Sequence, residues 1–193
     1  NLASPGALTS AQMAEIELHA QDLGVTLIPL MPCLGNVGYV LRHSAYAKLR
    51  EHPQFLQQYC PVNPETLNLV TTMMEDLLAV HPGKYFHIGG DEVSLLGANP
   101  VSHQRAQQLG GRAALYLEYI GKVCRYLLSR NRYPLIWDDI LRNMTDSQIQ
   151  WLPPEVTFIS RQRESHSERA TQHTLTSLDR YRKLGRCVWG AAV

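Results

Sequence analysis

The 193-residue sequence has no closely spaced pair of cysteines, no strong net charge and no long apolar run. Its four cysteines, Cys33, Cys60, Cys124 and Cys187, are widely spaced, and the absence of a Cys-x-x-Cys pair argues against a zinc knuckle or a thioredoxin-like motif. The formal net charge is +1, so the whole chain has no electrostatic bias toward nucleic acid or an anionic membrane. We therefore expect free thiols in a reducing compartment and no nucleic-acid or membrane partner.

Targeting signals and internal repeats are also missing. No signal peptide or low-complexity linker is visible, so we expect one domain over residues 1–193. The first residue is Asn1 rather than Met, and a signal on a lost N-terminal segment would send the protein to the lysosome or out of the cell. The composition, 45% hydrophobic and 18% charged, is typical of a globular domain.

Helix and strand signals alternate along the chain. Helices are expected over residues 9–22, 45–51, 63–80, 111–130, from 146, and 174–184, and strands over 25–31, 85–90, 133–139, 155–160 and 186–192. The strands are apolar throughout, which is typical of a parallel sheet covered by helices. Two α/β architectures fit this order: a doubly wound open sheet, or part of an eight-stranded barrel.

One strand ends in two glycines and two acids, Gly89-Gly90-Asp91-Glu92. Glycines permit a tight turn and an acid can cap a helix, so a purely structural interpretation is available. In parallel α/β folds, however, the carboxyl ends of the strands are where ligands bind. The pattern therefore leaves open a structural turn and two classes of enzyme.

The first class of enzyme comprises those that cyclise nucleotides. It is considered because the Gly-Gly-Asp-Glu run resembles the signature of diguanylate cyclases. That family expects Phe after the Glu, where this chain has Val93. It also expects a metal-binding acid on an upstream strand, but residues 25–31, VTLIPLM, contain no acid. A diguanylate cyclase-like enzyme is therefore kept only as a remote alternative.

The second class is glycoside hydrolysis. The stretch FHIGGDEV, residues 86–93, resembles position by position the motif that ends the fourth barrel strand in the family 20 β-N-acetylhexosaminidases, most closely the hexosaminidase D branch. Four blocks resemble the same family in the same order, namely residues 25–51, 63–97, 134–142 and 181–192. The resemblance implies an α/β fold, a partial (β/α)8 TIM barrel containing approximately strands 3 to 7. Either the chain is a fragment, or a partner or an altered topology covers the open edges.

The resemblance also implies a reaction, the hydrolysis of terminal non-reducing N-acetyl-β-D-hexosamine residues by a retaining, substrate-assisted mechanism. Asp91 would orient the 2-acetamido group of the sugar, and Glu92 would act as general acid and base. Successive strand residues point to opposite faces, so both acids reach one pocket only if the chain turns, as Gly89 and Gly90 permit. No cofactor and no metal are implied, and the partner is an N-acetylhexosamine-containing glycoside or glycoconjugate.

Four more residues are candidates for substrate binding. By resemblance, Trp137 forms a wall of the acetamide pocket, although a tryptophan packed against barrel helices is the alternative. Asp139 would bond sugar hydroxyls or cap a helix. His87 would hydrogen-bond within the barrel or be a buried structural histidine. Asn36 replaces a histidine that in the family helps to tune the catalytic acid.

The end of the sixth barrel strand departs from the family. Ser160, Arg161 and Gln162 stand where relatives carry aromatic residues, including a tyrosine that binds the oxazolinium ion. Together with Asn36, this departure leaves a second hypothesis, a catalytically weak or inactive carbohydrate-binding relative. The hexosaminidase D resemblance implies the cytoplasm and nucleus, and leaves open the oligomeric state and the choice between N-acetylglucosamine and N-acetylgalactosamine.

Three further residues lie near the expected site but are interpreted as structural. Tyr39 and Arg42 fall in the loop after the third barrel strand, where we expect a packing tyrosine and a surface arginine. Trp189, on the last expected strand, is assigned to the core rather than to the pocket.

Overall fold

A computed structural model describes residues 2, 5–161 and 168–191, without the side chains of 168–174. The α-helices of this part are α1 (Ser10–Asp22), α2 (Gly38–Leu41), α3 (Pro64–Leu78), α4 (Pro100–Leu109), α5 (Arg112–Ser129), α6 (Asp146–Ile149) and α7 (Glu168–Lys183). The 3-10 turns are η1 (Ser44–Leu49) and η2 (Leu141–Asn143). The strands are β1 (Arg50–His52), β2 (Phe55–Tyr59), β3 (Tyr85–His87), β4 (Tyr133–Trp137), β5 (Thr157–Arg161) and β6 (Val188–Ala191).

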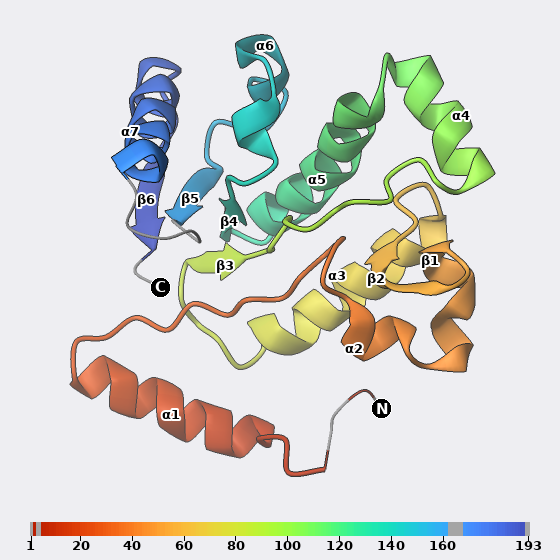
Figure 1. The fold of residues 1–193 in the computed structure, drawn as a ribbon. Coiled ribbons are helices and arrows are strands. Elements are labelled where there is room, and N and C mark those ends of the chain that lie inside the picture. The colour runs from red at the N-terminus through yellow and green to blue at the C-terminus, as the bar shows by residue number, and fades with distance from the viewer. Residues whose placement is uncertain (1, 3–4, 162–167, 192–193) are drawn as a thin grey trace.

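The main sheet is parallel, with the strand order β3-β4-β5-β6. Its register pairs Tyr85 with Tyr133, Leu135 with Thr157, and Phe158 with Val188. Helix α5 packs on β4, and α7 packs on β5 and β6, so helices cover the same side of the sheet (Figure 1). The predicted parallel α/β sheet is confirmed.

Two helices begin as their sequences predict. The side chain of Thr9 accepts a hydrogen bond from the Gln12 backbone N–H, and the side chain of Gln12 accepts one from the Thr9 backbone N–H, which makes a capping box for α1. Asn63 caps α3 by accepting from the backbone N–H of Glu65, and Pro64 occupies the first turn. These starts depend only on neighbours in sequence, and that explains why they were predictable.

The prediction of a buried strand over residues 25–31 is wrong. This extended segment touches β3 through a single parallel bridge, Leu30 to His87, with the His87 N–H donating to the Pro29 carbonyl at 2.8 Å. Pro29 has no N–H to extend the ladder. Val25 is 52% exposed and Leu30 is 49% exposed, so the segment is not covered on both faces.

Three elements were not predicted: the antiparallel hairpin of β1 and β2, the short helix α2, and helix α4. The expected helix over 45–51 is a 3-10 turn, η1, that runs into β1. Helix α4 does carry a start signal, because Asn99 accepts from the Val101 N–H and Pro100 follows it. Helix α4 was not predicted because its sequence is only weakly apolar, and the prediction of a helix depends on a periodic apolar stripe.

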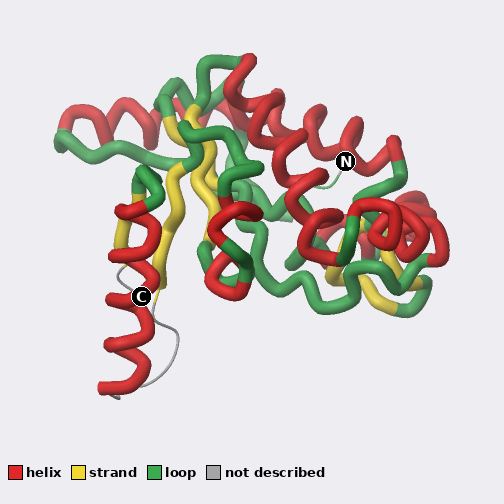
Figure 2. Tube along the Cα trace, turned by 90° about the horizontal axis from the view of Figure 1, so that it is seen from above, coloured by secondary structure: helices red, strands yellow, loops and turns green. Residues whose placement is uncertain are grey.

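The parallel sheet is strongly curved. The ring of Tyr85 on β3 lies 4.8 Å from the ring of Trp189 on β6, although β4 and β5 separate these strands. Side chains that alternate with these, such as Phe86 and Phe158, are completely buried under the helices on the other face. The view from above shows the strands grouped beside the helices (Figure 2). The concave face collects Tyr85, His87 and Trp189, as the wall of a partial barrel would.

Helix α1 stands apart from the sheet (Figure 1). Its main polar anchor is a buried hydrogen-bonded pair of Glu17 and His81, whose side chains are each 8% exposed. Apolar side chains such as Leu18 and Leu23 remain more than half exposed. Among the helices that the structure describes, none is both long enough and apolar enough to cross a membrane.

Candidate functional site

The turn that follows β3 is built from left-handed backbone. Gly89 has φ 69°, Gly90 has φ 87° and Glu92 has φ 54°. A positive φ costs glycine little but is uncommon for glutamate. The chain therefore turns sharply at the end of β3, as the glycine pair predicts.

Contacts from one helix, α5, and one strand, β4, hold this turn in place. The hydroxyl of Tyr116 on α5 donates to the carbonyl of Gly90 at 2.7 Å. A Cβ atom on Gly90 would lie 2.8 Å from Cγ1 of Ile136, so only glycine fits between α5 and β4. Tyr116 was not predicted as part of the site, because nothing local marks which face of a largely buried helix meets the turn.

The two adjacent acids have different surroundings. Asp91 is buried, with 4% of its surface exposed, whereas Glu92 is exposed. Both acids lie beyond the end of β3, and the left-handed backbone at Gly89, Gly90 and Glu92 sets the directions of their side chains. That both acids serve one sugar pocket stays a prediction.

Arg161, at the end of β5, lies at the centre of the site. Its Nη2 atom forms an ion pair with Oδ2 of Asp91, and its Nε atom lies 3.4 Å from Oδ2 of Asp139. Its guanidinium carbon lies 3.9 Å from the centroid of the Trp137 ring. The side chain of Arg161 is 11% exposed, so these contacts form a largely desolvated cluster.

Trp137 and His87 line the concave face beneath this cluster. Their ring centroids are 4.4 Å apart, so Trp137 faces the inside of the sheet rather than the outer helices. His87 Nδ1 accepts a hydrogen bond from the Gly89 N–H at 3.0 Å. The pKa of His87 is lowered to about 4, mainly because burial disfavours the charged ring; the charge of Asp91 opposes this effect and that of Arg161 adds to it. His87 is therefore neutral at pH 7 and supports the turn that carries the acids.

The neighbours Asp138 and Asp139 point to opposite faces of the chain and have different partners. Asp138 is completely buried and accepts from Arg142 Nε at 2.9 Å and Nη2 at 2.7 Å. The same guanidinium donates to the carbonyl of Arg161 at 2.9 Å and so fixes the end of β5. Asp139 instead faces Arg161 and the site. The sequence analysis did not single out Asp138 or Arg142, although their i, i+4 spacing was visible.

Asn36 lies beside the acid turn through its neighbour Gly35, which packs against the backbone of residues 91 and 92. Asn36 is partly buried and has φ 58°, a conformation that asparagine tolerates better than most residues. The position is therefore next to the site, as predicted, and its role toward a substrate stays a prediction.

A cavity of about 310 Å³ opens next to Asp139, between the loops that follow β3 and β4. Its lining includes Val93, Leu96, Tyr116, Ile140 and Met144. Within the described part of the chain, no group of three or more His, Cys, Asp or Glu residues is arranged to hold a metal ion.

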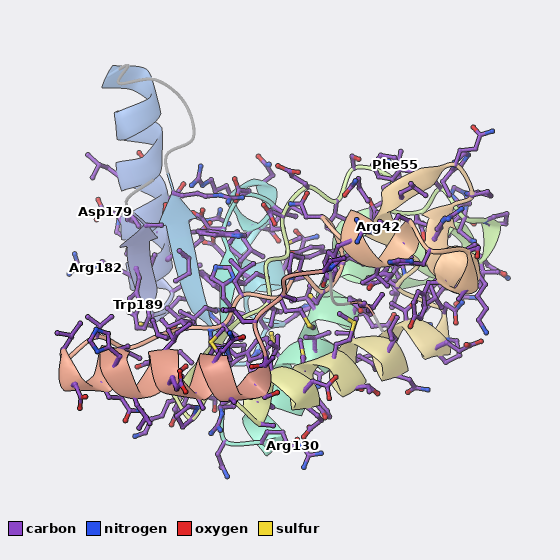
Figure 3. The ribbon with its side chains drawn as sticks, turned by 90° about the horizontal axis from the view of Figure 1, so that it is seen from below. Arg42, Phe55, Arg130, Asp179, Arg182 and Trp189 are labelled. Atoms are coloured by element: carbon purple, nitrogen blue, oxygen red, sulfur yellow. The ribbon has the colours of Figure 1, made fainter. Side chains whose placement is uncertain are left out.

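Tyr39 and Arg42 behave as the structural residues that the sequence predicts, whereas the assignment of Trp189 to the core is wrong, because its side chain is only partly buried and lies on the concave face of the sheet. Tyr39 packs against the core, and burial raises the pKa of its hydroxyl to about 12. Arg42 is exposed and lies far from Trp189 in the view from below (Figure 3). Trp189 packs on Tyr85, at the opposite end of β3 from the acids. Gln162, part of the departure from the family pattern, lies outside the described residues.

Arg161 is the most informative residue for which no role was predicted from the sequence. It was noted only as part of a departure from the aromatic residues of relatives, yet it contacts Asp91, Asp139 and Trp137. A signal was available, because alternation along β5 places Thr157, Ile159 and Arg161 on one face.

The chain is similar to known proteins in both sequence and fold. Residues 3–177 match the model of the glycosyl hydrolase family 20 catalytic domain. Hexosaminidase D of Bos taurus is 36% identical over 148 residues, which cover 74% of this chain and 42% of the bovine protein. Hexosaminidase D of Homo sapiens is 35% identical over 148 residues, which cover 74% of this chain and 30% of the human protein. The chain thus spans less than half the length of these relatives.

Solved structures show the same fold at low sequence identity. A β-N-acetylhexosaminidase from Bacteroides fragilis is 20% identical with a TM-score of 0.76, and the match covers 93% of this chain and 35% of that chain. A chitobiase from Flavobacterium johnsoniae is 20% identical with a TM-score of 0.77, covering 98% of this chain and 29% of that chain. The likeness confirms the partial TIM barrel. With its matched family model and its relatives above 30% identity, the chain belongs to glycosyl hydrolase family 20.

Proposed function

We propose that this chain carries the catalytic centre of a retaining β-N-acetylhexosaminidase, which removes terminal non-reducing N-acetyl-β-D-hexosamine residues. The observation that carries the proposal is the left-handed turn after β3, which buries Asp91 and presents Glu92 at the strand end. Membership of family 20 and the relatives named hexosaminidase D support the substrate class. The substrate is thus a glycoside or glycoconjugate that ends in an N-acetylhexosamine.

A substrate-assisted mechanism accounts for two acids that are neighbours in sequence. The acetamido oxygen of the sugar forms a bond to the anomeric carbon as the glycosidic bond breaks, and Glu92 gives its proton to the leaving oxygen. Asp91 accepts a hydrogen bond from the acetamide N–H and stabilises the oxazolinium cation. Water then attacks the anomeric carbon, Glu92 takes a proton from it, and the acetamide reforms with retained configuration. An intramolecular nucleophile of this kind lowers the barrier by up to ~7–11 kcal/mol in favourable cases.

Four residues complete the proposed pocket. Trp137 offers an indole face on the concave side of the sheet for the acetamide methyl group. Asp139, between the site and the 310 Å³ cavity, accepts hydrogen bonds from sugar hydroxyls. Asn36 borders the acid turn, and neutral His87 holds Trp137 and Gly89 in position.

The test is release of 4-nitrophenol from 4-nitrophenyl N-acetyl-β-hexosaminides by the full chain and two variants. Glu92→Gln and Asp91→Asn should each lower kcat/KM at least a hundredfold, since general acid catalysis alone contributes about 10²–10⁴-fold. Glu15→Gln, on the exposed face of α1, is the control and should leave turnover unchanged. Equal activity of Glu92→Gln and the unmodified chain would refute the proposal.

A second candidate function is sugar binding without turnover. The ion pair between Arg161 and Asp91 favours it, because a paired Asp91 is less available to the acetamide. Binding of N-acetylglucosamine-thiazoline without any hydrolysis of the chromogenic substrate would support this alternative. Hydrolysis abolished by Glu92→Gln would exclude it.

We also propose that the protein resides in the cytoplasm and nucleus. All four cysteines are unpaired, and Cys33, Cys60 and Cys124 are buried as thiols, which suits a reducing compartment. Fluorescence microscopy of the tagged full-length protein tests the proposal, and a lysosomal or secreted distribution would contradict it.

A further inference from the structure

The side chains around Arg161 form a cage for a cation. Asp91 and Asp139 contribute two carboxylates, and Trp137 contributes an aromatic face. We propose that this cage is a binding site for planar, delocalised cations, that Arg161 fills it in the resting protein, and that the reacting sugar must displace Arg161. The displacement rests on the proposed function, whereas the cage itself does not.

Charge decides which ligands the cage accepts. Among the contacts that the structure describes, the guanidinium of Arg161 faces two carboxylates, those of Asp91 and Asp139. Without the guanidinium, two carboxylates would share a largely desolvated site beside an indole ring. Aromatic faces and carboxylates both attract cations, and burial strengthens the attraction. An anionic sugar substituent would be repelled.

The shape of the cage restricts its ligands further, to flat cations. The guanidinium of Arg161 lies over Trp137 with its carbon 3.9 Å from the ring centroid, the arrangement of a flat cation on a flat ring. An N–H of the same group points to Asp91. The oxazolinium ion of the proposed reaction is also a planar, delocalised cation with one N–H. Arg161 therefore occupies the place of the intermediate and makes the same kinds of contact.

The backbone of Arg161 cannot easily retreat, because its carbonyl accepts a hydrogen bond from Arg142, which is itself held by buried Asp138. Displacement therefore requires rotation of the Arg161 side chain alone. Only the fraction of molecules with the side chain rotated away can bind the sugar productively, and the apparent affinity falls by that fraction. Arg161 is in this sense an internal competitor of the substrate.

The cage is tested by the binding of guanidinium ion, at millimolar concentration, to Arg161→Ala. Isothermal titration calorimetry should show binding at least tenfold tighter to Arg161→Ala than to the unmodified chain. Urea, which has nearly the same shape but no charge, should not bind. The matched control is Arg180→Ala, which removes a guanidinium that pairs with Asp146 without an aromatic ring. Guanidinium binding no tighter to Arg161→Ala than to Arg180→Ala would overturn the proposal, and Arg161→Gln repeats the test if the alanine variant fails to fold.

Turnover tests the displacement. Arg161→Ala should hydrolyse the 4-nitrophenyl substrate with kcat/KM raised about tenfold, and guanidinium should inhibit this variant competitively. Activity in the unmodified chain that disappears in Arg161→Ala would show that Arg161 is required, and would overturn the competition. Guanidinium binding to Arg161→Ala without turnover by either protein would support the cage and refute the proposed function instead.

Discussion

A Cβ atom added to Gly35 would lie 2.2 Å from the backbone oxygen of Asp91 and 3.0 Å from that of Glu92. Both neighbours are backbone atoms, so they cannot rotate out of the way as a flexible side chain would. The loop after residues 25–31 and the turn that carries the two acids are therefore packed backbone against backbone. Only glycine permits this approach, and the position of the acids depends on it.

Gly35→Ala should displace the acid turn. We expect a loss of about 1–3 kcal/mol in the free energy of unfolding, typical of overpacking, together with lower turnover of the chromogenic substrate. Urea unfolding and the 4-nitrophenol assay provide the two measurements. Gly190→Ala is the matched control, because a Cβ atom there would meet no heavy atom within 4 Å. If the two variants behave alike, the backbone contact does not position the site.

The stability of the fold should depend on the protonation of His87. The ordinary pKa of histidine is near 6.5, and burial lowers the pKa of His87 to about 4. Between these values the unfolded chain holds more protons, so the free energy of unfolding falls as the pH drops from 6.5 to 4. The loss amounts to roughly 3 kcal/mol and is complete below pH 4.

His87→Gln should flatten this pH dependence, measured by urea unfolding at several pH values between 4 and 7. His103→Gln is the control, because His103 is exposed on α4 and should retain the full slope. An unchanged slope in His87→Gln would assign the pH dependence to other groups.

The pair of Glu17 and His81 should hold helix α1 on the rest of the molecule. Removing one partner of this buried pair leaves the other side chain buried without its partner. Such a loss typically lowers the free energy of unfolding by about 3–5 kcal/mol. His81→Ala should therefore speed amide exchange and proteolysis in α1, while β3 to β6 stay protected. Lys48→Ala is the comparison, since its pair with Glu65 is more than half exposed and contributes at most about 1 kcal/mol. Equal protection of α1 in both variants would contradict this anchoring.

The neighbours Asp138 and Asp139 should respond differently to the same change. Asp138→Asn removes the charge from a fully buried partner of Arg142, and we expect the free energy of unfolding to fall by about 3 kcal/mol. Asp139→Asn should leave thermal unfolding nearly unchanged but raise KM for the chromogenic substrate. Thermal unfolding and steady-state kinetics of the two variants decide the matter, and the reverse pattern would exchange the roles assigned to these residues.

Local features of the fold were predictable wherever the cause lay within a few residues. The capping box at Thr9, the start of α3 at Asn63 and the turn at Gly89 and Gly90 all follow from side chains next to the backbone that they shape. The segment over 25–31 was misjudged, because its apolar sequence gives no information on whether a neighbouring strand covers it. Short elements such as β1 carry too few residues for a periodic pattern.

The candidate acids were likewise visible in the sequence, since Gly89-Gly90-Asp91-Glu92 is a contiguous motif and its backbone conformation is set locally. The presence of Arg161 in the site could not be predicted from a local motif. Arg161 reaches Asp91 across 70 positions of the chain, from a strand that β4 separates from β3. That contact exists because the curvature of the whole sheet brings the ends of β3 and β5 together on its concave face. Curvature of this kind arises from packing over all four strands, and no single stretch of residues encodes it.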